Sequence, residues 1–474
     1  MYKRFLELSF WIVFTILTTY YVPKFIQPAL YIIMLIAYYR SKNEPMWLAI
    51  FLVLSDGFLG FFNNYEVVLA VIPGLPPIEM GHFYVLLSII KATRYQPPGR
   101  FFFNTLLGVL TVYLGFLIVQ SYVLGLNPAM NVQFRLLKTI FPLGLFYAIP
   151  RLFRTEEDYR SFFAYMFPFA FTTLFAQVFT IVMHMSPSQF LGVHRKFWFT
   201  VDVNTGRTYR GFYSTATVLS TYFGSMYYLA HRGKNFNQLY LFAVLGASLM
   251  AAFLSATRGW VVGMSLSLIL FLFFVVKLSG KQVSRLALSA ALILISLMAI
   301  PIVNKQISLA IKRMTTLEAL ASGDRTAKGT LSRITERSPR VMNKWIESPL
   351  TGWGFSDTFT EYQDFHVGNQ NILLHSGILG AALLGMFFVY FHGKLFFRST
   401  LLPRGHPLKE ALLTFGVFFP GWFFIHSSSG QQFAYYQDPG QALVFVPYLY
   451  LGGLTYLNTI SQPEQSAVPA TENT

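Results

Sequence analysis

Residues 364–391 read DFHVGNQNILLHSGILGAALLGMFFVYF. The stretch opens with polar side chains, and from Asn371 to Phe391 it becomes an uncharged, largely apolar run. Such a run is long enough to cross a bilayer as a helix, which takes about 20 residues. The polar residues before it therefore lie at one mouth of a predicted membrane helix. What chemistry they can do depends on the side of the membrane that this mouth faces.

The composition of the whole chain indicates a membrane protein. Of its 474 residues, 54% are hydrophobic and 12% are charged, whereas a soluble domain is roughly 25% charged. Because long apolar runs recur along the chain, we predict an all-α, polytopic integral membrane protein with about 12–14 transmembrane helices. The chain has no cysteine, which excludes disulfides and thiolate metal sites. The net charge of +16 is typical of basic cytoplasmic loops and does not indicate nucleic-acid binding.

The apolar runs give a set of candidate spans. They lie at residues 5–22, 25–39, 46–62, 66–90, 101–124, 136–150, 161–185, 211–230, 238–256, 259–277, 286–303, 371–391, 410–426 and 440–458. The third and fourth spans are the weakest. Pro73, Pro76 and Pro77 interrupt the fourth, so we predict that it is broken or re-entrant.

The basic residues predict the topology. The chain begins MYKRFLELSFWIVFTILTTYYV, with a basic flank and no small-residue cleavage site, so we expect an uncleaved first span and a cytoplasmic N-terminus. Most lysines and arginines outside the long loop then fall in cytoplasmic segments, as the positive-inside rule requires. The resulting organisation is a multi-span region over 1–303, a long outer loop over 304–370, C-terminal membrane helices over 371–458 and a disordered tail over 459–474. Both termini are expected in the cytoplasm.

The long loop carries some structure of its own. Apolar residues recur over 331–347, including Val341 and Trp345, and predict a short amphipathic helix that Pro339 starts or kinks. In this topology the mouth at 364–371 faces outward.

Two arginines are expected on the same outer side as His366. Arg210 lies at the outer end of the eighth span, and Arg258 at the outer turn between the ninth and tenth. Guanidinium groups bind phosphate oxygens in a bidentate manner and keep their charge, and a neutral histidine can accept a proton from a hydroxyl. Together they favour transfer from a phosphate-activated donor to a hydroxyl acceptor. Because nucleotide sugars are absent outside the cytoplasm, the donor would be lipid-linked, and arginines could neutralise its phosphates without a metal.

Four blocks carry a family resemblance. HVGNQNILLHSGILG, in which His366 precedes Gly377 by eleven residues and Gly380 follows, resembles the signature of the O-antigen ligase and O-antigen polymerase superfamily. RGFYSTATVLSTY from Arg210, SATRGW around Arg258 and RVMNKWIESPLTGWGF from Arg340 resemble its other elements, and the likeness covers about 205–385.

The resemblance implies a GT-C-like all-helical glycosyltransferase of the bacterial inner membrane, without cofactor or metal. Its donor would be a glycan on undecaprenyl diphosphate, and its acceptor the lipid A core or a growing polysaccharide. His366 would be the catalytic base, and Arg210, Arg258 and Arg340 would bind the donor diphosphate.

Several residues keep a plainer interpretation beside the functional one. Val367 and His375 stand where the family has an asparagine and an acidic residue, so Asn369 or Asp364 is the candidate orienting partner of His366. Asn369, Asn371 and His375 could line the site, although His375 lies about one turn after Asn371 and the two could instead bond along one helix face. Arg258 could simply reach lipid headgroups, and Arg340 could belong to a solvated helix face.

Small residues in the stretch after Asn371 predict close helix packing. Gly377, Ala381 and Gly385 recur every four residues, as in closely packed membrane helices.

Two other functions are alternatives to the ligase. The first is a repeat-unit polymerase, which uses the same chemistry. A more distant one is a transporter of lipid-linked sugar or polysaccharide, but transporters carry ionisable groups near the middle of the membrane and show repeat symmetry between their halves. The predicted spans are nearly free of charge, which favours the transferase.

Overall fold

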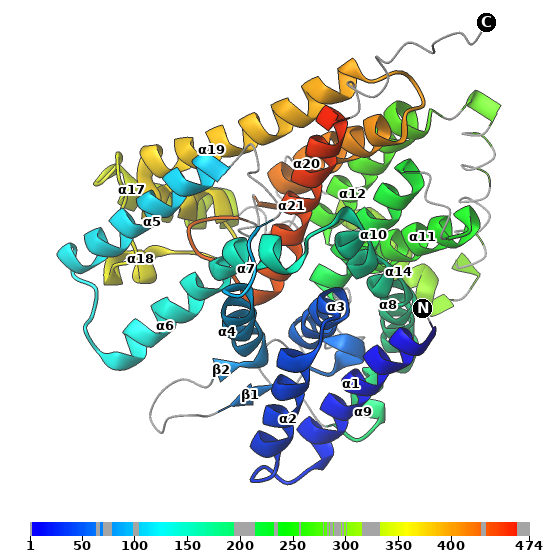
Figure 1. Cartoon of the computed structure of the whole chain (residues 1–474), viewed down its shortest axis with the longest axis horizontal. Helices are drawn as coiled ribbons and strands as arrows, with labels where there is room; N and C mark the ends of the chain where they lie inside the picture. The colour runs from blue at the N-terminus through cyan, green and yellow to red at the C-terminus, as the bar shows by residue number, and fades with distance from the viewer. Residues whose placement is uncertain are drawn as a thin grey trace, which may run out of the picture.

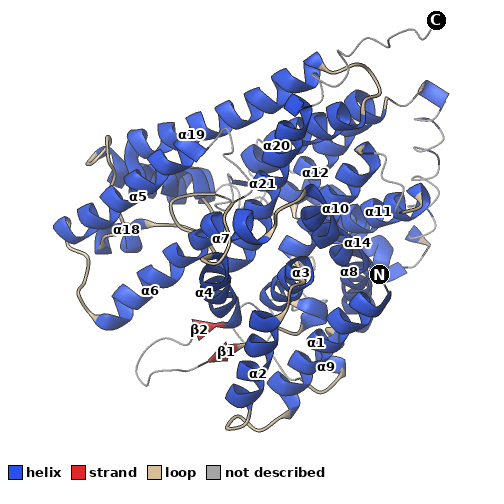
Figure 2. Cartoon of the chain, in the orientation of Figure 1, coloured by secondary structure: helices blue, strands red, loops and turns tan. Residues whose placement is uncertain are grey.

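A computed structural model of the chain describes residues 2–62, 67–69, 78–97, 104–193, 214–231, 236–255, 257–277, 301–314, 332–427 and 433–461, with isolated positions between 279 and 299. Figures 1 and 2 show a bundle of helices with one small two-stranded sheet at its edge. The first helices are α1 Tyr2–Tyr21, α2 Gln27–Arg40, α3 Glu44–Asp56, α4 Met80–Ala92, α5 Asn104–Val123, α6 Met130–Ile140, α7 Leu145–Leu152, α8 Glu156–Met183, α9 Pro187–Phe190 and α10 Thr215–Ala230.

The second half of the chain is equally helical where it is described. Its helices are α11 Gln238–Leu254, α12 Arg258–Leu270, α14 Pro301–Met314, α17 Ser338–Ile346, α18 Asp357–Tyr362, α19 Gly368–Leu401, α20 Pro407–Ser427 and α21 Pro439–Ser461. Single turns extend or join them: η1 Phe58–Gly60, η2 Phe141–Gly144, η3 Phe271–Val276 and η5 Arg333–Arg337. The strands are β1 Val68–Leu69 and β2 Ile78–Glu79, paired antiparallel.

The length and surface of these helices confirm an all-α, multi-pass membrane protein. Six segments of the described residues are long and apolar enough to cross a bilayer: Asn104–Val123, Met130–Leu152, Glu156–Met183, Gly259–Val276, Gly368–Leu401 and Pro439–Ser461. On α5, Val112 is 76% exposed and Val123 is 80% exposed. Apolar surface on this scale needs lipid around it. The total of 12–14 spans stays a prediction.

The centre of the bundle is built from aromatic side chains. Helix α8 packs against α10 and α11, and α20 packs against α12 and α19. Around Phe223 of α10, the ring centroids of Phe415, Phe418 and Tyr448 lie at 5.2, 4.7 and 4.7 Å. Edge and tilted contacts of this kind add to the packing energy, so α10, α20 and α21 form a common frame.

Two parts of the chain differ in detail from the predicted spans. The expected fourth span, 66–90, begins with the β1–β2 hairpin and is helical only from Met80, so its predicted break is confirmed. Pro73, Pro76 and Pro77 lie outside the described residues. The expected outer loop begins within α14, where Ile307 is buried against the bundle and the Gln306 side chain donates to the Leu254 carbonyl at 2.8 Å. This apolar contact explains why 301–314 is a packed helix and not a loop.

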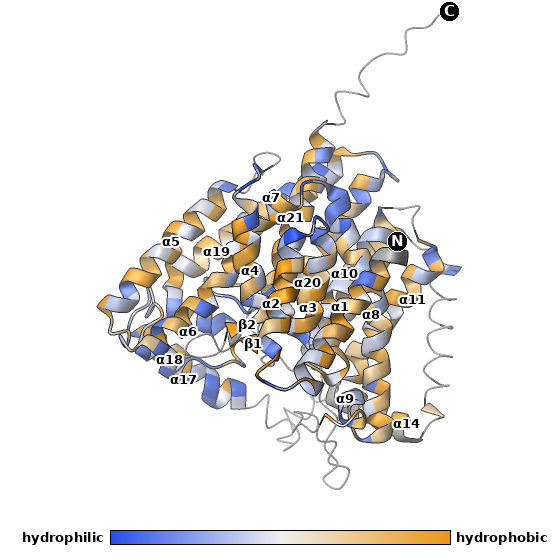
Figure 3. Cartoon of the chain, turned by 60° about the horizontal axis from the view of Figure 1, so that its bottom comes forward, coloured by the Kyte–Doolittle hydropathy of each residue, from blue (hydrophilic) through white to orange (hydrophobic). Residues whose placement is uncertain are grey.

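The rest of the described loop forms a polar layer beside the start of α19. The predicted helix over 331–347 is confirmed as η5 and α17, and Pro339 lies in the first turn of α17. Figure 3 shows hydrophilic residues gathered on α17 and α18 at the edge of the molecule, while the bundle helices are mainly hydrophobic. Helix α19 begins at Gly368, slightly before the expected 371, and α21 runs to Ser461, into the expected tail. Residues 462–474 lie outside the described residues.

Candidate active site at the start of α19

Helix α19 is broken in the middle of its first half. Gly377 has φ 62° and ψ −170°, which is not helical. The segment 349–355, sequence PLTGWGF, lies across this break and forms backbone hydrogen bonds with it. The Trp353 and Gly354 N–H groups donate to the carbonyls of Leu374 and His375 at 2.8 and 2.9 Å. In return, the Ile378 and Leu379 N–H groups donate to the carbonyls of Pro349 and Leu350 at 2.9 and 3.1 Å.

Glycines make this close approach possible. A side chain at Gly377 would meet Thr351 N at 2.5 Å and the Leu350 carbonyl closer still, and one at Gly352 would meet the α19 backbone at 2.7 Å. Both residues have positive φ, which glycine adopts without strain. The two glycine motifs of the sequence therefore form one structural unit. By contrast, nothing lies within 4 Å of a side chain placed at Gly385, so the prediction of a close-packing spacing is wrong at that position.

The docked loop also contacts α5. The Gln120 amide donates to Thr351 Oγ1 at 2.8 Å and to the Gly352 carbonyl at 3.0 Å, and Phe355 N–H donates to Ser121 Oγ at 2.6 Å. On the other side of the break, Tyr113 donates from its hydroxyl to the Ser376 carbonyl at 2.7 Å. The Tyr113 bond satisfies a carbonyl at the break in α19. The bonds with Gln120 and Ser121 hold the docked loop, so the mouth of α19 has a fixed position.

His366 lies at this mouth with its side chain exposed. Its backbone N–H donates to Asp364 Oδ1 at 2.9 Å. The backbone of Asp364 is in turn held by Asn371, whose side-chain amide donates to the Asp364 carbonyl at 2.8 Å and whose Oδ1 accepts from Asp364 N–H at 3.0 Å. Of the two candidate partners of His366, Asp364 is thus the one that fixes its backbone.

Asp364 also binds two arginines from the preceding helical segment. Arg337 Nη1 lies 3.2 Å from Asp364 Oδ1, and Arg340 Nη2 lies 3.7 Å from Oδ2. Burial raises the pKa of Asp364, but the His366 N–H and the Arg337 guanidinium outweigh this and leave the pKa below its ordinary value. The carboxylate is therefore ionised at neutral pH and holds two cations beside the histidine.

Arg340 keeps part of its guanidinium free for another partner. It is half-exposed, and beyond Asp364 it makes only long contacts among the described residues, at 3.3 Å to the Gln363 carbonyl and 3.5 Å to that of Tyr362. Arg337, which the sequence analysis missed, has the shorter bond to Asp364. The signal for it was its place one turn before Arg340, which puts both on one helix face.

His375 lies away from this polar group. It is fully buried, and Nδ1 contacts the Asn371 backbone carbonyl at 2.5 Å. Of the two alternatives for His375, this contact agrees with the bond along one helix face. Its ring centroid lies 5.2 Å from Tyr436, 5.4 Å from Phe359 and 5.6 Å from Phe355. Nε2 has no hydrogen-bond partner among the described residues. His375 and Asn371 therefore have a structural role at the start of α19.

The remaining predicted residues are placed only in part. Arg210 lies outside the described residues. Arg258 is the first residue of α12, and its side chain is not described. Asn369 is exposed in the first turn of α19. The start of α10 is anchored by Asp56, which accepts from Thr217 N–H at 2.6 Å and from the Thr215 hydroxyl at 3.2 Å.

The described part of the candidate site does not resemble a metal centre. In the described ranges, no three histidine, aspartate or glutamate side chains gather closely enough to hold a metal ion. No protein-family model matches the chain, and no curated protein shows significant similarity to it.

Proposed function

We propose that this protein is a membrane glycosyltransferase of the O-antigen ligase type with a GT-C-like fold. It transfers a glycan from undecaprenyl diphosphate to a hydroxyl of the lipid A core on the outer face of the bacterial inner membrane, with both of its termini in the cytoplasm. The observation that carries the proposal is the grouping of Arg337, Arg340 and His366 around Asp364 at the mouth of α19.

The chemistry follows from what these groups can do. His366 takes the proton of the acceptor hydroxyl while the oxygen attacks the anomeric carbon of the donor sugar. The new carbon–oxygen bond forms as the bond from that carbon to the diphosphate breaks, and the diphosphate leaves with the electron pair. Arg340 binds the departing phosphate, because a planar guanidinium matches its oxygens and a fixed cation stabilises the charge that develops.

The predicted topology supports the assignment of Arg210 and Arg258 to the same reaction. In that topology α10, α12 and α19 all run from the outer face to the inner face. Arg210 just before α10, Arg258 at the start of α12 and His366 just before α19 then share one side of the membrane. We assign both arginines to the donor diphosphate, with Asn369 at the rim of the site.

Complementation of a ligase-deficient bacterial strain tests the proposal. The wild-type gene is expected to restore full-length surface glycan on a gel, and His366→Ala to abolish it at equal protein level. His406→Ala, in the loop at the far end of α19, is the matched control and should behave as wild type. Surface glycan at the wild-type level from His366→Ala would refute the mechanism. Rescue of a polymerase-deficient strain instead would assign the acceptor to a growing polysaccharide.

A further inference from the structure

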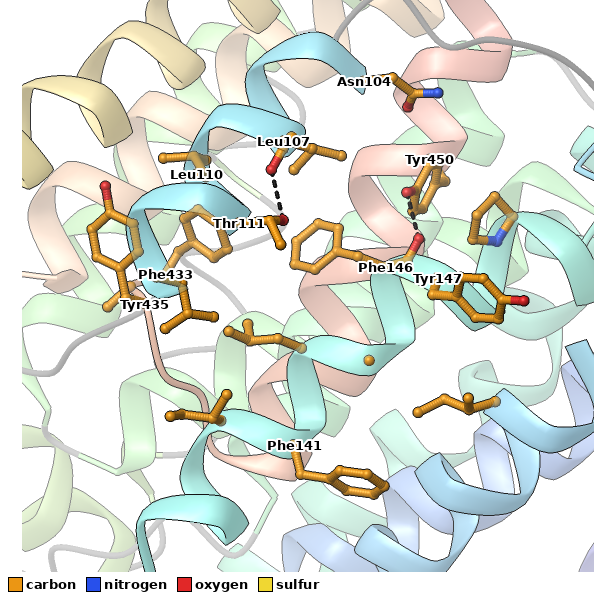
Figure 4. A pocket seen from close by; sticks show the side chains of 18 of the residues that line it. Asn104, Leu107, Leu110, Thr111, Phe141, Phe146, Tyr147, Phe433, Tyr435 and Tyr450 are labelled. Carbon is orange, nitrogen blue, oxygen red and sulfur yellow. Dashed lines mark hydrogen bonds between the residues drawn. The ribbon is translucent and has the colours of Figure 1, made fainter. Parts of the chain in front are cut away.

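A cavity of about 560 Å³ lies beside α5, apart from the candidate active site. Its size falls in the range of small-molecule sites, roughly 300–1,000 Å³. It is lined mainly by apolar residues of α5, η2, α7 and the segment before α21, including Leu107, Leu110, Phe141, Phe146 and Phe433. Figure 4 shows these side chains around an open space, with Asn104 at one end of α5 and Phe141 at the opposite end of the cavity.

The lining of this cavity also has a polar and cationic part. Asn104 at the start of α5 and Arg151 at the end of α7 both line it. Arg151 stacks on Tyr147 at 3.7 Å and donates to the Tyr147 carbonyl at 2.8 Å. It forms no ion pair with a carboxylate of the described residues. Its remaining guanidinium donors can therefore bind an anion beside the apolar lining.

We propose that this cavity binds an anionic phospholipid of the surrounding bilayer, with its phosphate on Arg151 and Asn104 and one acyl chain along Leu107, Leu110 and Phe146. The guanidinium forms charge-assisted hydrogen bonds to phosphate oxygens. It favours a headgroup with net negative charge, because it repels the choline cation of a zwitterionic headgroup. The apolar lining takes the chain. In the predicted topology Arg151 faces the cytoplasmic leaflet, where anionic lipids attract basic residues.

The site does not depend on the glycosyltransferase assignment. It shares neither His366 nor the arginines around Asp364. The most direct evidence for it would be a preference between two lipids that have the same acyl chains and headgroups of different net charge.

Native mass spectrometry of the delipidated protein in detergent can measure this preference. The protein is titrated with phosphatidylglycerol or with phosphatidylcholine of the same acyl chains. Phosphatidylglycerol should bind about tenfold more tightly, because it lacks the choline cation that the Arg151 guanidinium repels. Arg151→Gln should remove the difference. Arg154→Gln is the matched control, since Arg154 is exposed and does not line the cavity, and it should keep the difference.

A second pair of variants tests the acyl-chain part of the site. Gly108 lines the cavity and Gly115 does not, and a side chain added at either glycine of α5 meets nothing within 4 Å. Gly108→Phe should fill the space and abolish retention of phosphatidylglycerol, whereas Gly115→Phe should retain it. Gly108→Leu serves if the larger side chain prevents folding. Equal affinity for the two lipids, unchanged binding by Arg151→Gln or by the filled cavity, or displacement by equimolar polyprenyl phosphate would each overturn the proposal.

Discussion

Asp364 organises the candidate active site at the level of single residues. Its carboxylate binds Arg337 and Arg340, and its oxygen Oδ1 also accepts the backbone N–H of His366. Both backbone polar groups of the same residue are held by Asn371. One side chain therefore sets the positions of two cations and a histidine relative to one another.

Removal of the Asp364 charge should weaken this arrangement in a pH-dependent way. Because the pKa of Asp364 is lowered in the folded protein from its ordinary 3.8, the ionised carboxylate stabilises the fold fully at pH values above 3.8. The stabilisation is lost as the pH falls through the lower folded-state pKa. Asp364→Asn should reduce the free energy of unfolding by about 1 kcal/mol at pH 7, since half-exposed ion pairs are screened.

Unfolding of wild type and Asp364→Asn, followed by tryptophan fluorescence from pH 7 to pH 3, checks this prediction. The difference between the two proteins should shrink as the pH falls below 3.8. Asp357→Asn is the control, because the Asp357 carboxylate accepts from Asn127 N–H at 3.1 Å and contacts neither arginine. A difference that stays constant to pH 3 would show that the stabilisation does not come from ionisation of Asp364.

Arg340 allows a second test at the residue scale. Arg340→Lys keeps the positive charge but loses the planar fork, so glycan transfer should fall by about tenfold, the equivalent of one charge-assisted hydrogen bond. Arg404→Lys, in the loop between α19 and α20, should transfer at the wild-type rate. Rates are compared by the amount of surface glycan formed per unit time after induction. An unchanged rate for Arg340→Lys would remove this residue from the donor site.

At the scale of elements, the loop 349–355 and the break in α19 depend on one another. Gly377 has positive φ and direct backbone contact with Leu350 and Thr351, whereas Gly385 on the same helix has free space around it. Gly377→Ala should therefore destabilise the protein by at least about 1–3 kcal/mol, as strained backbone positions do. Gly385→Ala should be neutral or slightly stabilising, by up to about 1 kcal/mol, because alanine favours the helix.

Thermal unfolding in detergent compares the two glycine variants. The Gly377→Ala protein should also lose transfer activity, because the docked loop lies between the segment that carries Arg337 and Arg340 and the segment that carries His366. Equal melting temperatures for the two variants would contradict the role of the break.

The sequence predicted some elements well and others poorly, for physical reasons. Long uncharged runs such as 371–391 are read directly from hydropathy, because only a helix can satisfy the backbone in lipid. The break at Gly377 was not predicted, since its freed backbone groups are satisfied by 349–355, a tertiary contact without local signal. Gly377, whose spacing suggested close helix packing, is instead the place where 349–355 docks on α19. Helix α14 was missed for a similar reason, as its burial against Leu254 depends on α11.

The candidate site shows the same difference between residues with a local sequence signal and residues whose role depends on tertiary contacts. The position of His366 at a helix mouth followed from the apolar run after it, and Arg340 was a candidate through the family resemblance. Arg337 was overlooked because its importance comes from the carboxylate of Asp364, which lies 27 positions along the chain and reaches it only through folding.

At the scale of the whole molecule, the proposed reaction requires the mouth of α19 to face the outer side of the membrane. The chain contains no cysteine, so single cysteines at the exposed positions Glu361 and Glu157 report the two sides without background. An impermeant maleimide applied to intact spheroplasts should label Glu361→Cys. It should label Glu157→Cys only after the membrane is permeabilised. The reverse pattern would place His366 in the cytoplasm and remove the proposed reaction.

The most direct measurement of the central claim uses purified protein in liposomes with a glycan on undecaprenyl diphosphate and a lipid A core acceptor. The quantity measured is the rate at which undecaprenyl diphosphate is released together with glycosylated acceptor. The wild-type protein should release both in equal amounts, and His366→Ala should be slower by about 10²–10⁴-fold, the usual contribution of proton transfer by a positioned base. Release by His366→Ala at the wild-type rate, or no transfer by the folded wild-type protein to either a lipid A core or a polysaccharide acceptor, would contradict the account.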